Sequence, residues 1–314
     1  MRVAVVGAGL AGLAAARELV GRGHEAIVIE KSRGMGGRLA ARRAEGTVLD
    51  HGSRVVAAPA GTPLRALVDR FELPDRVDLD EGIAFASGAT RLPKRMAEGL
   101  EVRLGVRLVA LRAAAGGLEL GDEQGNTHGA VDAVIVTAPA PQAADLIERS
   151  PEAGPRASAL RAVSYAPAVM VLLGLRMGPE PGWEVLRDGA GPVAEVRRES
   201  VKGRPPVHGV EPVVVRLDER ASSELLDASD EAVLERALPA LAGLLGTASA
   251  PPAWAQVKRW RFAVPAGPGD ADAINPPGSR IVVAGDTLTG AGFASSDHHR
   301  VYESGILAAR RVGA

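Results

Sequence analysis

The chain opens with Val3-Ala4-Val5-Val6-Gly7-Ala8-Gly9-Leu10-Ala11-Gly12, an apolar strand that runs into a Gly-x-Gly-x-x-Gly turn. Residues 10–21 continue with apolar side chains at helical spacing, and 26–29 form a second apolar strand. The first glycine permits the turn, the second lets the backbone approach a pyrophosphate, and the third lets the helix pack against the strand. The helix N-terminus then attracts the anion. The sequence therefore predicts a dinucleotide site whose phosphate-binding residues are Gly7, Ala8, Gly9, Leu10, Ala11 and Gly12.

A carboxylate and a second glycine-rich loop follow the second strand. Glu30 is placed to accept the ribose hydroxyls, and its charge disfavours a dinucleotide that carries a 2′-phosphate. The next stretch is residues 31–38. Its glycines at 36 and 37 let the backbone come close to a phosphate, and Arg38 supplies a forked cationic donor. A plain NAD dehydrogenase has no reason to direct a second loop at the diphosphate, and a solvated basic turn is the alternative interpretation. The loop favours FAD and adds the candidate cofactor residues Lys31, Arg33, Gly36, Gly37 and Arg38.

The far end of the chain carries two further motifs. Gly285-Asp286 follows a predicted strand over 281–284, and an acid there can accept from ribityl hydroxyls. Ser304-Gly305 enters a predicted helix over 302–312, where its amides would lie near the pyrimidine edge of a flavin. Gly-Asp after a strand is on its own more often a turn. Together with the N-terminal loops, however, Gly285, Asp286 and Ser304 indicate FAD.

Composition excludes several chemistries and several partners. Cys is 0, which rules out a thiol nucleophile, a redox disulfide, Cys-ligated metals and attachment of a flavin through Cys. His51 is interpreted as a packed histidine, and covalent attachment of the flavin to it is the alternative. The FAD is therefore predicted to be noncovalent. A net charge of -1 gives no general attraction for nucleic acid. The sequence contains no run of 18 apolar residues, so a membrane span is not expected. The expected location is the cytoplasm, the expected partner is a small-molecule substrate, and the oligomeric state stays open.

The remaining pattern predicts an α/β fold in which a mixed-sheet substrate domain is inserted into a doubly wound FAD-binding domain. Further strands are expected over 101–111, 117–121, 131–137, 165–175, 193–197 and 210–217, a helix over 229–245, and a loop over 264–279. The basic pairs 42–43 and 197–198 are interpreted as solvated. The FAD-binding domain is predicted to comprise 1–52, 93–150 and 275–314, and the substrate domain 53–92 and 151–274.

Over nearly its whole length the chain resembles the renalase-like branch of the FAD-dependent amine oxidase superfamily. The resemblance rests on the two glycine loops and on the segments 49–52, 138–143, 259–263, 285–286 and 304–309. It implies a two-domain flavoprotein in which the backbone at Leu108 contacts the adenine. It also implies hydride transfer from isomeric dihydronicotinamide dinucleotides to FAD, with O2 as acceptor. The alternatives are an amine or polyene oxidoreductase of the wider superfamily, and a FAD-binding protein without turnover.

The chain departs from this family on the expected substrate side. Residues 53–56 read Ser-Arg-Val-Val where Gln and aromatic residues are usual, and aromatic residues make up only 3% of the chain. The connection from Gly285 to Ser304 is longer than expected. A loop that closes over the cavity and a plain surface loop are the two interpretations. No nucleophile motif and no metal-ligand cluster accompanies this connection, so no metal is expected. The catalytic candidates are His298, His299, Tyr302, Trp260 and Arg261.

Overall fold

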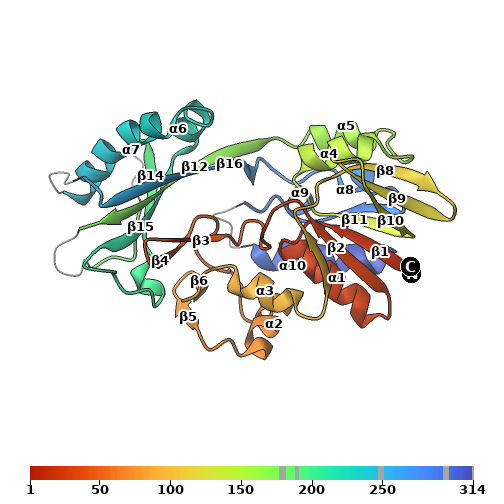
Figure 1. Ribbon diagram of the computed structural model, residues 1–314, viewed down its shortest axis with the longest axis horizontal. Helices are drawn as coiled ribbons and strands as arrows, with labels where there is room; N and C mark the ends of the chain where they lie inside the picture. The colour runs from red at the N-terminus through yellow and green to blue at the C-terminus, as the bar shows by residue number, and fades with distance from the viewer. Residues whose placement is uncertain (177–181, 188–190, 247–250, 293–296, 313–314) are drawn as a thin grey trace.

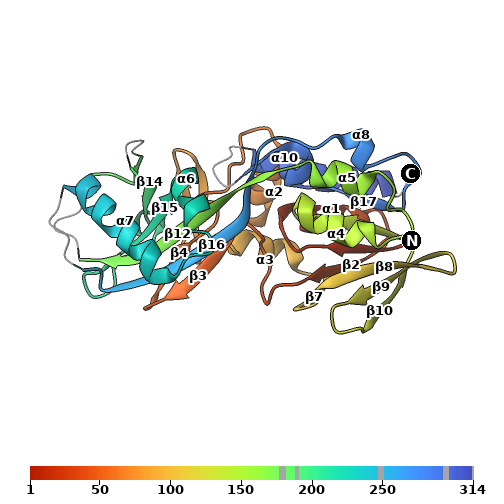
Figure 2. The ribbon, with the colours of Figure 1, turned by 90° about the horizontal axis from the view of Figure 1, so that it is seen from above.

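The computed structural model describes residues 1–176, 182–187, 191–246, 251–292 and 297–312. The molecule is elongated, with a parallel sheet at one end and an antiparallel sheet at the other (Figure 1). The long strands β12 (Tyr165–Leu175) and β16 (Trp254–Pro265) extend from the antiparallel sheet toward the parallel one, as the view from above also shows (Figure 2). The predicted fold class, α/β with a doubly wound Rossmann-type domain, is confirmed.

The parallel sheet has the strand order β17-β11-β1-β2-β7. Its strands are β1 (Arg2–Val6), β2 (Glu25–Glu30), β7 (Glu101–Leu104), β11 (Ala133–Val136) and β17 (Ile281–Val283). The four strands other than the edge strand β7 are nearly continuous apolar runs because both faces of the sheet are covered. One face packs on α1 (Leu10–Gly21), α3 (Arg91–Ala97) and α10 (His298–Val312). The other packs on α4 (Ala140–Glu148), α5 (Arg156–Arg161) and a meander of β8 (Leu108–Ala114), β9 (Gly117–Asp122) and β10 (Thr127–Val131).

A small helical and hairpin segment also packs on the α1 face of this sheet. It comprises α2 (Pro63–Phe71), β5 (Arg76–Leu79) and β6 (Gly82–Phe85). Leu64, Leu67 and Phe85 are buried in the same core as β1 and α1. The segment therefore shares a core with the nucleotide-binding elements, while the domain limits given above stay a prediction.

The antiparallel sheet has the order β13-β14-β15-β12-β16. Its other strands are β13 (Val185–Leu186), β14 (Val193–Arg198) and β15 (Glu211–Leu217), and the described pairings are all antiparallel where a mixed sheet was expected. The helices α6 (Glu219–Glu224) and α7 (Asp230–Leu245) contribute to the apolar core on one face. The hairpin of β3 (Ala41–Ala44) and β4 (Thr47–Asp50) packs on the other. A 3₁₀ turn, η1 (Ser200–Lys202), follows β14.

Three predicted element limits were wrong. The strand over 101–111 breaks at Gly105, whose φ of +73° ends β7 before β8 begins. The loop over 264–279 starts with the end of β16 and contains α8 (Ala271–Ile274). The connection between Gly285 and Ser304 is not one long loop, because α9 (Asp286–Thr289) occupies its start and α10 already begins at His298. Residues 293–296, which also belong to this connection, lie outside the described part of the chain.

Candidate cofactor and substrate cavity

A cavity of about 1080 Å³ lies where the carboxyl ends of the parallel strands meet β16 of the antiparallel sheet. This is the position at which doubly wound sheets bind nucleotides, and the volume is at the upper end of the usual range of roughly 300–1,000 Å³ for ligand sites. Most of the predicted cofactor residues line it: Gly7, Gly9, Leu10, Ala11, Glu30, Lys31, Gly36, Gly37, Arg38, Leu108, Gly285 and Asp286. Four predicted residues do not line it, namely Ala8, Gly12, Arg33 and Ser304.

The two glycine loops form one continuous cradle. Gly36 N donates to the carbonyl oxygen of Ala8 at 2.8 Å, and a Cβ on Gly37 would lie only 3.3 Å from the Cα of Gly9. Gly12 lies behind this cradle, where a Cβ would meet the carbonyl oxygen of Gly7 at 1.9 Å. No side chain caps the N-terminus of α1, so its first amides are left for a ligand. These observations fit a diphosphate held between the loops.

Glu30 fixes the two loops to the end of β2. Its side chain is only 9% exposed. Oε2 accepts from Ala8 N at 2.9 Å, and Oε1 accepts from Ser32 N at 2.8 Å. Each carboxylate oxygen keeps a lone pair for a further donor. The contact with Glu30 also explains how Ala8 contributes to the site without lining the cavity.

Arg38 and Asp286 both line the cavity and pair with each other. Arg38 Nη2 donates to Asp286 Oδ2 at 2.7 Å and to the carbonyl oxygen of Phe262 at 3.1 Å. The Tyr165 hydroxyl donates to the same Asp286 oxygen at 2.6 Å, and burial together with this carboxylate raises the pKa of Tyr165 above its usual value. Ser304 acts on the same turn indirectly, because its Oγ accepts from Gly285 N at 2.9 Å. Tyr165 carries no signal in the sequence, since it begins an apolar strand without a motif around it.

Of the candidates on α10, only His298 lines the cavity. Its side chain is 9% exposed, Nδ1 accepts from Ala57 N at 3.2 Å, and Nε2 lies 3.0 Å from the Ser53 hydroxyl. Burial, reinforced by the charge of Arg38, lowers the pKa of His298 to about 4. His298 is therefore a neutral, buried group in the wall of the cavity.

His299 and Tyr302, which were also catalytic candidates, do not line the cavity. His299 Nδ1 is buried, and Tyr302 packs in the apolar core shared with α1. Because α10 is helical from His298 onward, neighbouring side chains point in directions about 100° apart. His299 therefore points away from the cavity, whereas Tyr302, about one turn after His298, contributes instead to the core with α1.

The strand β16 supplies the opposite wall of the cavity. Trp260 stacks on His51 with ring centroids 5.5 Å apart and donates from Nε1 to the His51 carbonyl oxygen at 2.9 Å. Lys258 lies on the same face of the strand, with Nζ 5.5 Å from the centre of the Trp260 ring. Burial, reinforced by the charge of Lys258, lowers the pKa of His51 to about 4. Arg261 touches the rim of the cavity, but its guanidinium pairs with Asp227 at the surface.

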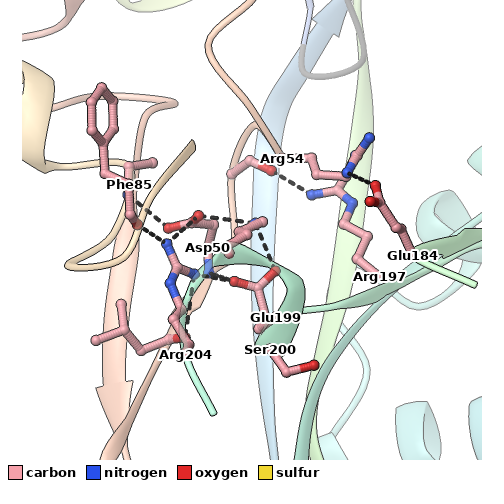
Figure 3. Close-up of polar contacts among 12 residues, drawn as sticks. Asp50, Arg54, Phe85, Glu184, Arg197, Glu199, Ser200 and Arg204 are labelled. Atoms are coloured by element: carbon pink, nitrogen blue, oxygen red, sulfur yellow. Dashed lines mark hydrogen bonds and ion pairs between the residues drawn. The ribbon is translucent and has the colours of Figure 1, made fainter. Parts of the chain in front are cut away.

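A buried network of charges holds the end of β4 (Figure 3). Lys202 Nζ lies 3.0 Å from Asp50 Oδ2 and 2.8 Å from Glu199 Oε1, and Arg204 pairs with both carboxylates. Two cations thus balance two carboxylates, all at most 4% exposed. The network fixes Asp50, the residue directly before His51.

The Arg197 side chain adds a bond to the same segment. Its Nη1 donates to the carbonyl oxygen of Gly52 at 2.8 Å. Arg197 and Arg198 are 1% and 5% exposed, so their interpretation as a solvated pair was wrong. Charged residues at the end of a strand look alike in sequence whether they face water or buried partners. The segment from Asp50 to Ser53 is consequently held from several sides.

Two family models match the chain. Residues 78–313 match the model described as flavin containing amine oxidoreductase, and residues 5–71 match the NAD(P)-binding Rossmann-like domain. The first match covers well over half of the chain. The chain belongs to the flavin-containing amine oxidoreductase family, a family of FAD-dependent oxidoreductases, and FAD is its cofactor.

Individual relatives agree at the level of the fold. A 4,4'-diapophytoene desaturase (4,4'-diaponeurosporene-forming) of Staphylococcus aureus (strain Newman) is 41% identical over 59 residues, which is 19% of this chain and only 12% of that enzyme. An Exiguobacterium sp. 255-15 protein, provisionally assigned as a protoporphyrinogen oxidase, has a TM-score of 0.78 at 14% identity, covering 98% of both chains. Putrescine oxidase bound to putrescine has a TM-score of 0.73 at 15% identity, again covering 98% of both.

In the described part of the chain, no helix is long and apolar enough to cross a membrane. The same residues contain no group of three or more His, Cys, Asp or Glu side chains suited to a metal ion.

Proposed function

We propose that the chain is a renalase-like oxidoreductase that takes a hydride from a small, anionic, reduced substrate, with isomeric dihydronicotinamide dinucleotides as the leading class and O2 as final acceptor. The observation that carries the proposal is the charge of the cavity wall formed by β16. Lys258 has no carboxylate partner among the described residues, and the nearest ring groups are Trp260 and the neutral His51. A substrate phosphate or carboxylate would supply the missing negative charge.

The carboxylates of the cavity support the same assignment. Glu30 and Asp286 are already engaged with the glycine loops and with Arg38. Asp145 and Glu148 lie on α4, beside the part of the cavity lined by Leu108. Among the described lining residues, none of the carboxylates lies on β16, where the substrate is expected. A cationic amine would therefore meet the unpaired ammonium group of Lys258 without a counter-charge.

When bound, FAD accepts the hydride and passes the electrons on. The residues of this chain then have three tasks. The glycine loops and Glu30 would hold the dinucleotide, and the Arg38–Asp286 pair would offer it further polar contacts. Trp260 and His51 would form an apolar and neutral surface that excludes water. No protein nucleophile is required for this chemistry.

The cofactor is proposed to be noncovalent. His51 is the residue for which attachment was considered, and its ring is occupied by stacking on Trp260. Acid precipitation of the purified yellow protein should leave FAD in the supernatant. Colour that stays in the pellet would contradict this part of the proposal.

The substrate class is tested by anaerobic reduction of the holoenzyme with a panel of donors. The panel contains NADH aged so that it includes its isomers, fresh NADH, putrescine and a polyene in detergent. We expect the flavin absorbance to bleach with the aged NADH and to recover in air. Bleaching by putrescine or the polyene alone would favour the wider-superfamily alternatives, and no bleaching by any donor would favour a FAD-binding protein without turnover.

A further inference from the structure

Ser53 and His298 form a hydrogen-bonded pair in the wall of the cavity. The Ser53 hydroxyl lies 3.0 Å from His298 Nε2, the Ser53 residue is 1% exposed, and both side chains line the cavity. In hydrolases, such a pair is a nucleophile and its base. The hydrogen bonds around this pair give it a different role.

The backbone fixes which nitrogen of His298 carries the proton. Ala57 N donates to Nδ1 at 3.2 Å, so Nδ1 is an acceptor. A neutral imidazole has one N–H, which must then be on Nε2 and must point at the Ser53 oxygen. Burial keeps the ring neutral, because it lowers the pKa of His298 to about 4. His298 therefore donates to Ser53 and cannot remove its proton.

The proton of the Ser53 hydroxyl is consequently left without an acceptor. Among the described residues, the only side-chain contact of this hydroxyl is the one with His298. The Ser53 amide donates to the carbonyl oxygen of Arg38 at 2.9 Å, which fixes the residue against the second glycine loop. A buried donor without a partner costs free energy of about 1–3 kcal/mol. A ligand acceptor in the cavity would remove that cost.

We propose that Ser53 donates a hydrogen bond to a carbonyl oxygen of the FAD ring system and that His298 holds the hydroxyl in this orientation. FAD is favoured over the substrate as the acceptor because Ser53 is bonded to Arg38, which belongs to the cofactor cradle. Ser53 is then a cofactor-binding residue and His298 a positioning residue. The inference depends on FAD being the cofactor and not on the identity of the substrate.

A hydrogen-bond donor at a ring carbonyl stabilises the reduced cofactor, in which that oxygen carries more negative charge. Ser53→Ala should lower the equilibrium constant for reduction of the bound FAD about tenfold. For a two-electron couple, tenfold corresponds to a midpoint potential more negative by about 30 mV. The visible spectrum of the oxidised flavin should shift as well, since its ring loses a hydrogen bond.

The midpoint potential of each holoenzyme variant is measured by equilibration with a reference dye, together with its visible spectrum and FAD affinity. Ser222→Ala is the matched control, because Ser222 is also fully buried and bonded, to Val169 N and the Leu217 carbonyl oxygen. We expect the control to keep the potential of the unmodified protein. His298→Leu should reproduce most of the Ser53→Ala shift. His298→Gln should reproduce little of it, because an amide can both accept from Ala57 N and donate to Ser53.

Two results would overturn the inference. A Ser53→Ala protein with the potential, spectrum and FAD affinity of the Ser222→Ala control would show that Ser53 does not contact the flavin. A shift in Ser53→Ala that is absent from His298→Leu would show that His298 does not orient the hydroxyl. Because no substrate is used, neither result depends on the proposed reaction.

Discussion

Glu30 is the residue whose loss should weaken cofactor binding most directly. Glu30→Ala removes the acceptor of the Ala8 and Ser32 amides and the proposed partner of the ribose hydroxyls. Buried donors left unpaired cost roughly 1–3 kcal/mol. FAD affinity, measured by fluorescence titration of the apoprotein, should fall about tenfold or more. Glu25→Ala is the control, since Glu25 begins the same strand but pairs only with Arg2 at the surface. Equal FAD affinity in both variants would show that the adenosine does not lie along β2.

The side chains at the start of α10 are expected to differ in their effect on the flavin. From sequence, His298 and His299 were both catalytic candidates within the connection from Gly285 to Ser304. The structure leaves only His298 in the cavity wall, whereas Arg300 is exposed and lies 3.9 Å from Asp297. Changes at His299 or Arg300 are therefore expected to leave the flavin properties unaltered.

Among the elements, the contact between α1 and α10 depends on a missing side chain. A Cβ on Gly305 would lie 2.1 Å from the carbonyl oxygen of Ala11. Gly305→Ala must push α10 away from α1, which should cost about 1–3 kcal/mol in the free energy of unfolding. Urea unfolding measures this, with Gly243→Ala as control, since a Cβ on Gly243 meets no atom within 4 Å. Because Ala11 lines the cavity, FAD affinity should fall in Gly305→Ala as well; equal stability of the two variants would contradict the close helix contact.

The buried charge network at the end of β4 is expected to stabilise the fold. Lys202→Met leaves Asp50 and Glu199 buried with only Arg204 as a cation. Breaking one partner of a buried ion network typically costs about 3–5 kcal/mol. The midpoint of urea unfolding should drop accordingly, whereas Lys94→Met on the exposed side of α3 should change it little. A Lys202→Met protein as stable as its control would mean that the network does not stabilise β4.

The elements that sequence predicted well are those with local signals. The glycine spacing of residues 7–12 identifies the first turn because the six residues are contiguous and a Cβ on Gly12 would meet the carbonyl oxygen of Gly7 within the same turn. Tyr165, Ser53 and Arg197 have no such signal, since their partners lie more than a hundred residues away along the chain. The strand β16 was missed because its charged and aromatic residues alternate between two partly covered faces, and neither face reads as apolar.

For the whole molecule, two buried histidines predict how stability depends on pH. Burial lowers the pKa of His51 and of His298 from 6.5 to about 4. Between these values the unfolded chain binds protons that the folded protein does not, so stability is full above about pH 6.5 and falls as the pH drops toward 4. Each histidine should contribute a loss of up to about 3 kcal/mol over this range.

Urea unfolding at several pH values, each with saturating FAD, measures this dependence. His51→Asn and His298→Gln should each flatten the slope between about pH 6.5 and 4, because each removes one titrating group. An unchanged slope in both variants would show that other groups dominate the acid response.

The charge of the β16 wall tests the central claim about the whole molecule, that FAD in this cavity oxidises an anionic donor. The measurement is the apparent Kd for isomer-containing NADH in anaerobic reduction of the holoenzyme. Lys258→Glu should raise this Kd at least about tenfold, equivalent to about 1.4 kcal/mol of binding free energy. The affinity for FAD should stay the same. Arg261→Glu is the matched control, because Arg261 lies on the same strand but pairs with Asp227 at the surface. If Lys258→Glu and Arg261→Glu bind the donor as tightly as the unmodified protein, the substrate does not meet this wall. The claim that the cavity binds an anionic donor is then contradicted.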